Sequence, residues 1–164
     1  MKTENATEAK MDLIHISATV VAGSNRRMVA TSRGHETIMD ARKEWGGDDA
    51  GPTPVEGLTI ALGGCIFNVC RILAAEKQIE MKDIQVSIAG DVDPSRAFGL
   101  ETDTRAGFSQ LSVQVEFSSE LSSSDKEEFR QELLKRCPLC DTISNPTPLQ
   151  LRFGVGSRRD HLVL

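Results

Sequence analysis

The stretch TPVEGLTIALGGCIFNVCRILAAEK, residues 53–77, decides the fold because it predicts one long helix that is apolar on nearly every face. Thr53 and Glu56 fit the two ends of a capping box, and Pro54 occupies the favoured first helical position. The apolar side chains that follow recur with the period of an α-helix, and others fill the remaining faces. Such a helix is typically buried. We therefore expect it in the middle of the protein, running to about Lys77.

Strand patterns lie on both sides of this helix. Alternating apolar and polar residues, or short apolar runs between turns, predict strands. These segments are 13–21, 28–32, 36–39, 84–92, 111–117 and 149–155. A second capping box, Ser124 to Glu127, begins a shorter helix that Pro138 should end near Arg136, with a short helix or turn at 139–144. An antiparallel N-terminal meander, further strands and two helices, one of them buried, indicate an α+β domain.

The composition is that of an ordinary globular protein. The net charge is −5 and the basic residues are scattered among acidic ones, which argues against nucleic-acid binding. The polar start, 1–10, has no apolar segment typical of a secretory signal, so we expect a disordered tail before a single domain at 11–164. The longest uncharged run, 57–70, is too short to cross a bilayer. These features predict a cytoplasmic protein without a membrane partner.

Four cysteines in such a chain are expected to be reduced thiols. Gly63 and Gly64 precede Cys65, and each costs a helix interior about 1 kcal/mol relative to Ala. Either another element packs closely there, or a small molecule must reach the sulfur. Cys65 and Cys137 can meet only if the two helices pack together; alternatively, both are packing residues. Cys70 lies about 140° around the helix from Cys65 and is expected to be a packing residue.

Cys137 and Cys140 form a CxxC motif. In thioredoxin-like proteins this motif begins a helix after a strand, whereas here it follows a helix, which counts against a redox module. A zinc site usually needs about four ligands, and neither a second cysteine pair nor a suitably spaced histidine accompanies the motif. We therefore expect no metal and no other cofactor.

Glu56 has two interpretations. It closes the capping box, or it holds a guanidinium beside a reactive sulfur. The preceding loop supplies Arg42 for the second role. Arg26, Arg27 and Arg33, near the first turns, are the other candidates.

Three segments taken in order resemble the osmotically inducible protein C and organic hydroperoxide resistance (OsmC/Ohr) superfamily. They are TPVEGLTIALGGC (53–65), IQVSIAGDVDP (84–94) and ELLKRCPLCDTI (132–143). The resemblance extends over roughly residues 13–155, and is to the OsmC-like branch. It implies a two-layer α+β fold, with antiparallel sheets around a buried central helix, and an intertwined homodimer.

The resemblance also implies an activity, that of a thiol-dependent peroxidase that reduces organic hydroperoxides and is itself reduced by an external dithiol. By motif position, Cys65 resembles the peroxidatic cysteine and Cys137 the resolving one. Glu56 resembles the acid that orients an essential arginine. Such an enzyme would serve defence against oxidative stress.

The source of the arginine differs between branches of the superfamily. Arg42 resembles the position used in one branch, and Arg26 or Arg27 that used in the other. The chain departs from the family pattern at Cys140, where a serine is common. That extra thiol is an alternative resolving residue in place of Cys137.

The surroundings of the first cysteine would select the substrate. Gly63 and Gly64 would leave room for a bulky hydroperoxide, while Ile66, Phe67 and Trp45 would favour an organic one. Two other functions fit the same residues. One is a non-enzymatic protein that binds a small apolar ligand at the dimer interface, and the other is a redox module built on the CxxC motif.

Overall fold

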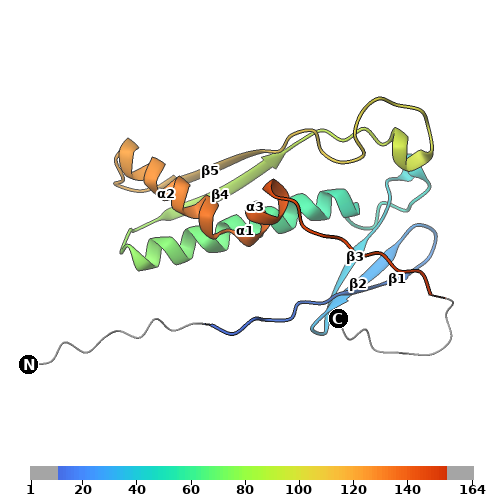
Figure 1. The fold of residues 1–164 in the computed structure, drawn as a ribbon, viewed down its shortest axis with the longest axis horizontal. Coiled ribbons are helices and arrows are strands. Elements are labelled where there is room, and N and C mark those ends of the chain that lie inside the picture. Colours follow the sequence, from blue (N-terminus) through green and yellow to red (C-terminus); the bar gives the residue numbers. More distant parts are fainter. Residues whose placement is uncertain (1–10, 155–164) are drawn as a thin grey trace, which may run out of the picture. The chain divides into compact units, whose positions relative to one another are not determined.

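The computed structural model of the chain describes residues 11–154 (Figure 1). The tail expected at 1–10 lies outside the described residues. The fold is mixed α+β, with two small antiparallel sheets and a long central helix, α1. The chain divides into two compact units, the first ending at Ile60 and the second beginning at Ala61.

The first unit contains a three-stranded antiparallel sheet. Its strands are β1 (Thr19–Ala22), β2 (Met28–Ser32) and β3 (His35–Met39), paired in that order. The β2–β3 hairpin turns at Arg33 and Gly34, whose φ angles are 49° and 81°. Positive φ at both residues of a two-residue loop is typical of a type I′ turn, whose twist matches that of the strands. The two strands predicted around this turn are confirmed.

The strand predicted at 13–21 is wrong before Thr19. Pairing between β1 and β2 begins at Thr19, which lies opposite Thr31. Strand β2 ends at Ser32, one residue after Thr31, so it has no further residues with which 13–18 could pair. Ser32 instead donates one side-chain hydrogen bond of 2.8 Å to the carbonyl of Ser17.

Helix α1 (Pro54–Glu76) begins at the predicted capping box. The Thr53 amide donates to the Glu56 carboxylate at 2.8 Å, and the Glu56 amide donates to the Thr53 hydroxyl at 3.3 Å. This reciprocal pair satisfies two backbone N–H groups that have no partner inside the helix. The predicted start is therefore confirmed, and the helix ends one residue before the predicted Lys77.

The expectation that α1 is buried all round is wrong for the described chain. One stripe is buried, whereas Ile60 and Ile72 remain 62% and 50% exposed. The buried residues are Leu62, Ile66, Val69, Cys70, Leu73 and Ala74. By length and composition α1 also passes as a membrane-spanning helix, with a mean hydropathy of 1.8, but the core helix of a soluble protein passes the same test.

Later elements of the second unit pack over the buried stripe of α1. Its elements after α1 are β4 (Lys82–Ala89), β5 (Ser112–Ser118), α2 (Ser123–Arg136) and α3 (Pro138–Ser144), and the two strands pair antiparallel. All four occur within a few residues of their predicted positions. Helix α2 ends at Arg136, as the proline two residues later predicts.

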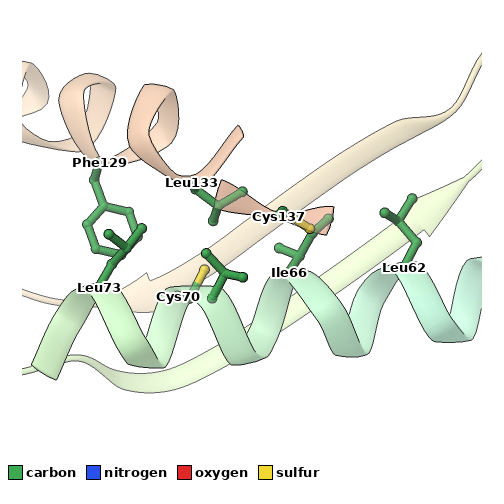
Figure 2. Packing of buried hydrophobic residues seen from close by; sticks show 8 residues of the cluster. Leu62, Ile66, Cys70, Leu73, Phe129, Leu133 and Cys137 are labelled. Atoms are coloured by element: carbon green, nitrogen blue, oxygen red, sulfur yellow. The ribbon is translucent and has the colours of Figure 1, made fainter. Parts of the chain in front are cut away.

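The core of this unit joins α1 to α2 and to the start of α3. In Figure 2, Phe129, Leu133 and Cys137 point toward the buried stripe of α1. Val86 from β4 and Val115 from β5 are partly buried against the same cluster. The fold therefore brings residues of both predicted helices into one apolar interior.

Two further predictions need correction. The capping box of α2 is formed by Ser122 and Asp125, not by Ser124 and Glu127. Three consecutive serines offer equivalent hydroxyls, and the Asp125 carboxylate reaches back to the Ser122 amide at 3.3 Å. The strand predicted at 149–155 is not formed over 149–154, where the described chain provides no partner, and residue 155 lies outside the described part.

Candidate functional site

The second unit brings two thiols together. Cys65 lies on α1 and Cys137 between α2 and α3, and their sulfurs are 3.4 Å apart. Cys137 is buried, whereas Cys65 is partly exposed, and both are free cysteines. Because a disulfide bond is about 2.0 Å long, the sulfurs need to approach by little more than about 1 Å to be joined. Two residues separated by 72 positions are thus placed for disulfide chemistry.

The electrostatic environment differs between these two sulfurs. Cys137 is the N-cap residue of α3, although its side chain makes no regular capping hydrogen bond. Burial opposes ionisation of Cys137, but the backbone amide of Cys140, the Cys65 thiol and the Leu139 amide favour the thiolate, so its pKa is lowered. Burial raises the pKa of Cys65. The Leu139 amide lowers it, but Cys137 raises it further. In the described chain the pair therefore holds a negative charge best on Cys137.

The CxxC motif follows helix α2, as predicted from the sequence, and also begins the short helix α3. Cys137 precedes the first residue of α3 and Cys140 is the third, so the motif straddles the helix start. Cys140 is partly exposed, and burial, followed by the neighbouring Cys137, raises its pKa to about 12. Within 11–154 no group of three or more His, Cys, Asp or Glu residues is arranged to hold a metal ion.

Cys70 is a core residue, as predicted. Its side chain is fully buried in the cluster between α1 and α2. Burial raises its pKa to about 11. A thiol in that environment is protonated and unreactive at neutral pH.

In the first unit, Glu56 closes the capping box and also binds a guanidinium. One carboxylate oxygen accepts from the Thr53 amide, and the other accepts from the Arg42 guanidinium at 2.6 Å. The Thr53 amide and then Arg42 lower the pKa of Glu56, and Glu56 raises that of Arg42. The guanidinium carbon of Arg42 also lies 5.3 Å from the centre of the Trp45 ring, within cation–π range. Arg42 is therefore held from two sides.

The other candidate arginines have different partners. Arg26 donates to the carbonyl of Trp45 at 2.6 Å. Arg27 forms an ion pair with Asp48 at 3.5 Å. Arg33 is the first residue of the β2–β3 turn. Arg26 and Arg27 thus fix the loop that follows β3, and Arg42 is the arginine that Glu56 orients.

Sequence reasoning missed Asp40. This residue is completely buried, and its carboxylate accepts from the backbone amides of Ala41, Asp48 and Ala50 at 2.8, 3.1 and 3.1 Å. Burial opposes ionisation, but these amides outweigh it and lower the pKa of Asp40. The carboxylate therefore ties together both ends of the loop that carries the arginine and the tryptophan. The available signal was an acid at the end of a strand, before a long aperiodic loop.

The two glycines beside Cys65 are not explained by close packing within the described chain. A methyl group on Gly63 would lie an ordinary 3.5 Å from Ile88, and one on Gly64 would have no neighbour within 4 Å. Ile66 points into the core and Phe67 is half-buried. The space beside Gly64 is thus open in the described chain.

Comparisons with known proteins agree with this architecture. Residues 46–152 match the family described as OsmC-like protein. A protein of Mycoplasma pneumoniae named "Hydroperoxide reductase" is 25% identical over 137 residues, which cover 84% of this chain and 92% of that protein.

Solved structures share the fold. A crystal structure of an OsmC-like protein from Mycoplasma pneumoniae has a TM-score of 0.70 and 24% identity, covering 82% of this chain and 89% of that one. An organic hydroperoxide resistance protein OsmC from Legionella pneumophila has a TM-score of 0.58 and 17% identity, covering 81% and 91%. Since the family match spans more than half of the chain, this protein belongs to the OsmC-like family.

Proposed function

We propose that this protein is a dithiol peroxidase that reduces organic hydroperoxides to alcohols. The observation that supports the proposal most strongly is the 3.4 Å contact between the sulfurs of Cys65 and Cys137. Two thiols at this distance need to approach by only about 1 Å to be joined as a disulfide. Membership of the OsmC-like family and the similarity to a protein named hydroperoxide reductase favour a peroxide as the oxidant.

Cys65 is the proposed nucleophile because it is the more accessible of the two sulfurs. Its thiolate attacks one oxygen of the hydroperoxide, the O–O bond breaks, and the alcohol leaves after taking a proton. Cys65 then carries a sulfenic acid, which is two electrons more oxidised. Cys137 attacks that sulfur, forms the disulfide and releases water. An external dithiol returns both cysteines to thiols by exchange.

This mechanism requires a positive charge at Cys65, because burial raises the pKa of that thiol. We propose Arg42, from the same chain or from a second copy, as the source of that charge. A guanidinium stays ionised at all relevant pH values and can also donate to a peroxide oxygen. The bond with Glu56 and the contact with Trp45 hold its planar group ready for this role.

We further propose that the protein works as a homodimer in the cytoplasm. Two segments with strand-like alternation have no partner strand in the described chain and expose their apolar residues, which are Leu13, Ile14, Ile16, Leu149, Leu151 and Phe153. A second copy would supply both the pairing and the cover. Light scattering after gel filtration should give twice the mass of one chain.

A coupled assay tests the proposed activity. Cumene hydroperoxide is the substrate and dithiothreitol the external dithiol. Cys65→Ser should abolish consumption of the hydroperoxide, whereas Cys70→Ser should retain it, because that sulfur is a packing residue. Equal activity of the two variants, with both folded by circular dichroism, would refute the proposal.

A further inference from the structure

A third thiol adjoins the proposed catalytic pair. Cys140 is the third residue of α3 and Cys137 its N-cap, and the two thiols share a side-chain hydrogen bond. Cys65, Cys140 and Leu139 pack against the same core cluster, of which Cys137 is a fully buried member. Cys137 therefore interacts with both of the other thiols, Cys65 and Cys140.

We infer that the disulfide formed between Cys65 and Cys137 is passed on to Cys137 and Cys140 before an external dithiol reduces it. This inference rests on the proposed function, because the peroxidase reaction supplies the first disulfide. It assigns to Cys140 the role of a second resolving residue and makes the CxxC motif the part of the protein that faces the reductant.

The transfer is an ordinary thiol–disulfide exchange. The thiolate of Cys140 attacks the sulfur of Cys137, a bond forms between these two, and the bond between Cys137 and Cys65 breaks. Cys65 leaves as a thiolate and takes up the proton that Cys140 released to solvent. No net oxidation occurs, so the step needs no further reactant.

Oxidation itself prepares Cys140 for the attack. In the reduced protein, burial raises the pKa of Cys140, and the sulfurs of Cys137 and Cys65 raise it further. Once those sulfurs are joined they carry neither charge nor proton, so only burial still opposes the Cys140 thiolate. The amides of Leu139 and Cys140 at the start of α3 stabilise a thiolate on Cys137, so this sulfur is a good leaving group when the external dithiol attacks Cys140.

The position of α3 makes a disulfide at Cys140 easier for an external reductant to reach. Its seven residues include no buried side chain, whereas the Cys137 sulfur is completely buried. Cys140 is partly exposed and at the edge of the core. Moving the disulfide toward α3 would free Cys65 for another hydroperoxide while the reductant engages the short helix.

Peptide mapping distinguishes the two disulfides. Trypsin cuts after Arg136 and after Arg71 but not between Cys137 and Cys140. The first disulfide therefore joins two tryptic peptides, while the second is a loop within one peptide that is two hydrogens lighter. Reduced protein, freed of reductant, receives one equivalent of cumene hydroperoxide, is quenched in acid at intervals, and is alkylated with N-ethylmaleimide after unfolding.

The expected result is a crosslink between Cys65 and Cys137 that decays as the loop peptide grows, with Cys65 becoming alkylatable again. In Cys140→Ser the crosslink should persist, and in Cys70→Ser, the matched cysteine control, the transfer should proceed as in the wild type. A wild-type crosslink that persists as it does in Cys140→Ser would overturn the inference and leave the peroxidase intact.

Two other outcomes also decide the matter. If the loop peptide forms as fast in Cys65→Ser as in the wild type, the CxxC motif reacts on its own and the transfer is refuted. If the wild type neither consumes the hydroperoxide nor forms any disulfide, both the transfer and the proposed function are refuted.

Discussion

The guanidinium of Arg42 lies 2.6 Å from one carboxylate oxygen of Glu56, while the other oxygen of the same carboxylate closes the capping box of α1. A single side chain thus fixes both the start of the long helix and the orientation of the arginine that we propose to act on the thiol. The two tasks can be separated by substitution, because glutamine also closes a capping box but carries no charge.

Glu56→Gln should reduce kcat/KM for cumene hydroperoxide with little loss of stability. Glu56→Ala should reduce both, lowering the free energy of unfolding by roughly 1 kcal/mol through the lost cap. Glu128→Gln is the control, since that residue forms an exposed ion pair with Lys77 at 2.9 Å. Peroxidase kinetics and urea unfolding provide the two readouts. If Glu56→Gln is as active as Glu128→Gln, the ion pair with Arg42 has no catalytic role.

The pH dependence of Cys65 alkylation should shift in opposite directions in two variants. Only the thiolate reacts, so the rate with iodoacetamide rises with pH through the pKa of Cys65. Cys137 helps to raise that pKa, so Cys137→Ser should move the midpoint to lower pH. Arg42→Met removes the proposed stabilising charge and should move it to higher pH. An unchanged midpoint in Arg42→Met would contradict the role given to this arginine.

Asp40 should control the loop that holds the only tryptophan. Its amide partners hold its pKa below the ordinary value of 3.8, so the carboxylate stabilises the loop above that pH and ceases to do so as the pH falls through the lowered pKa. Acid titration followed by Trp45 fluorescence should show a transition below pH 3.8. Asp40→Asn should shift the emission already at pH 7 and remove that transition. An identical emission spectrum at pH 7 would contradict this account.

Neighbouring leucines on α2 should differ sharply in their effect on stability. Leu133 is 7% exposed in the core, whereas Leu134 is 44% exposed. Leu133→Ala should lower the free energy of unfolding by about 2–5 kcal/mol through lost burial and a residual cavity. Leu134→Ala should cost less than about 1 kcal/mol. Urea unfolding of the two variants measures the difference, and equal losses would mean that the face of α2 is wrongly assigned.

Gly64→Ala tests why a glycine precedes the reactive cysteine. An added methyl group meets open space in the described chain, so the substitution should raise stability by up to about 1 kcal/mol through helix propensity. It should also lower kcat/KM for cumene hydroperoxide more than for hydrogen peroxide, because the bulky substrate needs the space. A destabilised variant would show instead that the glycine is needed for packing against another chain.

Much of this fold follows from local signals in the sequence. The start of α1 is set by Thr53 and Glu56, which are three residues apart, and the end of α2 by Pro138. Such signals act over one helical turn and are visible in any window of sequence. The sequence also indicated that Cys65 and Cys137 would meet if the two predicted helices pack together, but it could not establish that packing.

Apart from the capping box of α2, which lies two residues earlier than predicted, the failures concern partners distant in sequence. Strand-like alternation at 13–18 and 149–154 is genuine, but a strand needs a neighbour, and the described chain supplies none. The prediction that α1 is buried on every face failed for a similar reason, because the described chain supplies no element to cover its exposed face. The buried carboxylate of Asp40 could not be found either, since its backbone partners lie in a loop without periodicity.

Trapping of sulfenic acid tests the central claim most directly. In the variant Cys137→Ser/Cys140→Ser the nucleophile has no resolving partner, so one equivalent of cumene hydroperoxide in the presence of dimedone should add one dimedone group per chain. Peptide mass spectrometry should place that group on Cys65. Consumption of the hydroperoxide with no adduct at Cys65, or with the adduct at Cys70, would contradict the assignment of Cys65 as the sulfur that attacks the peroxide.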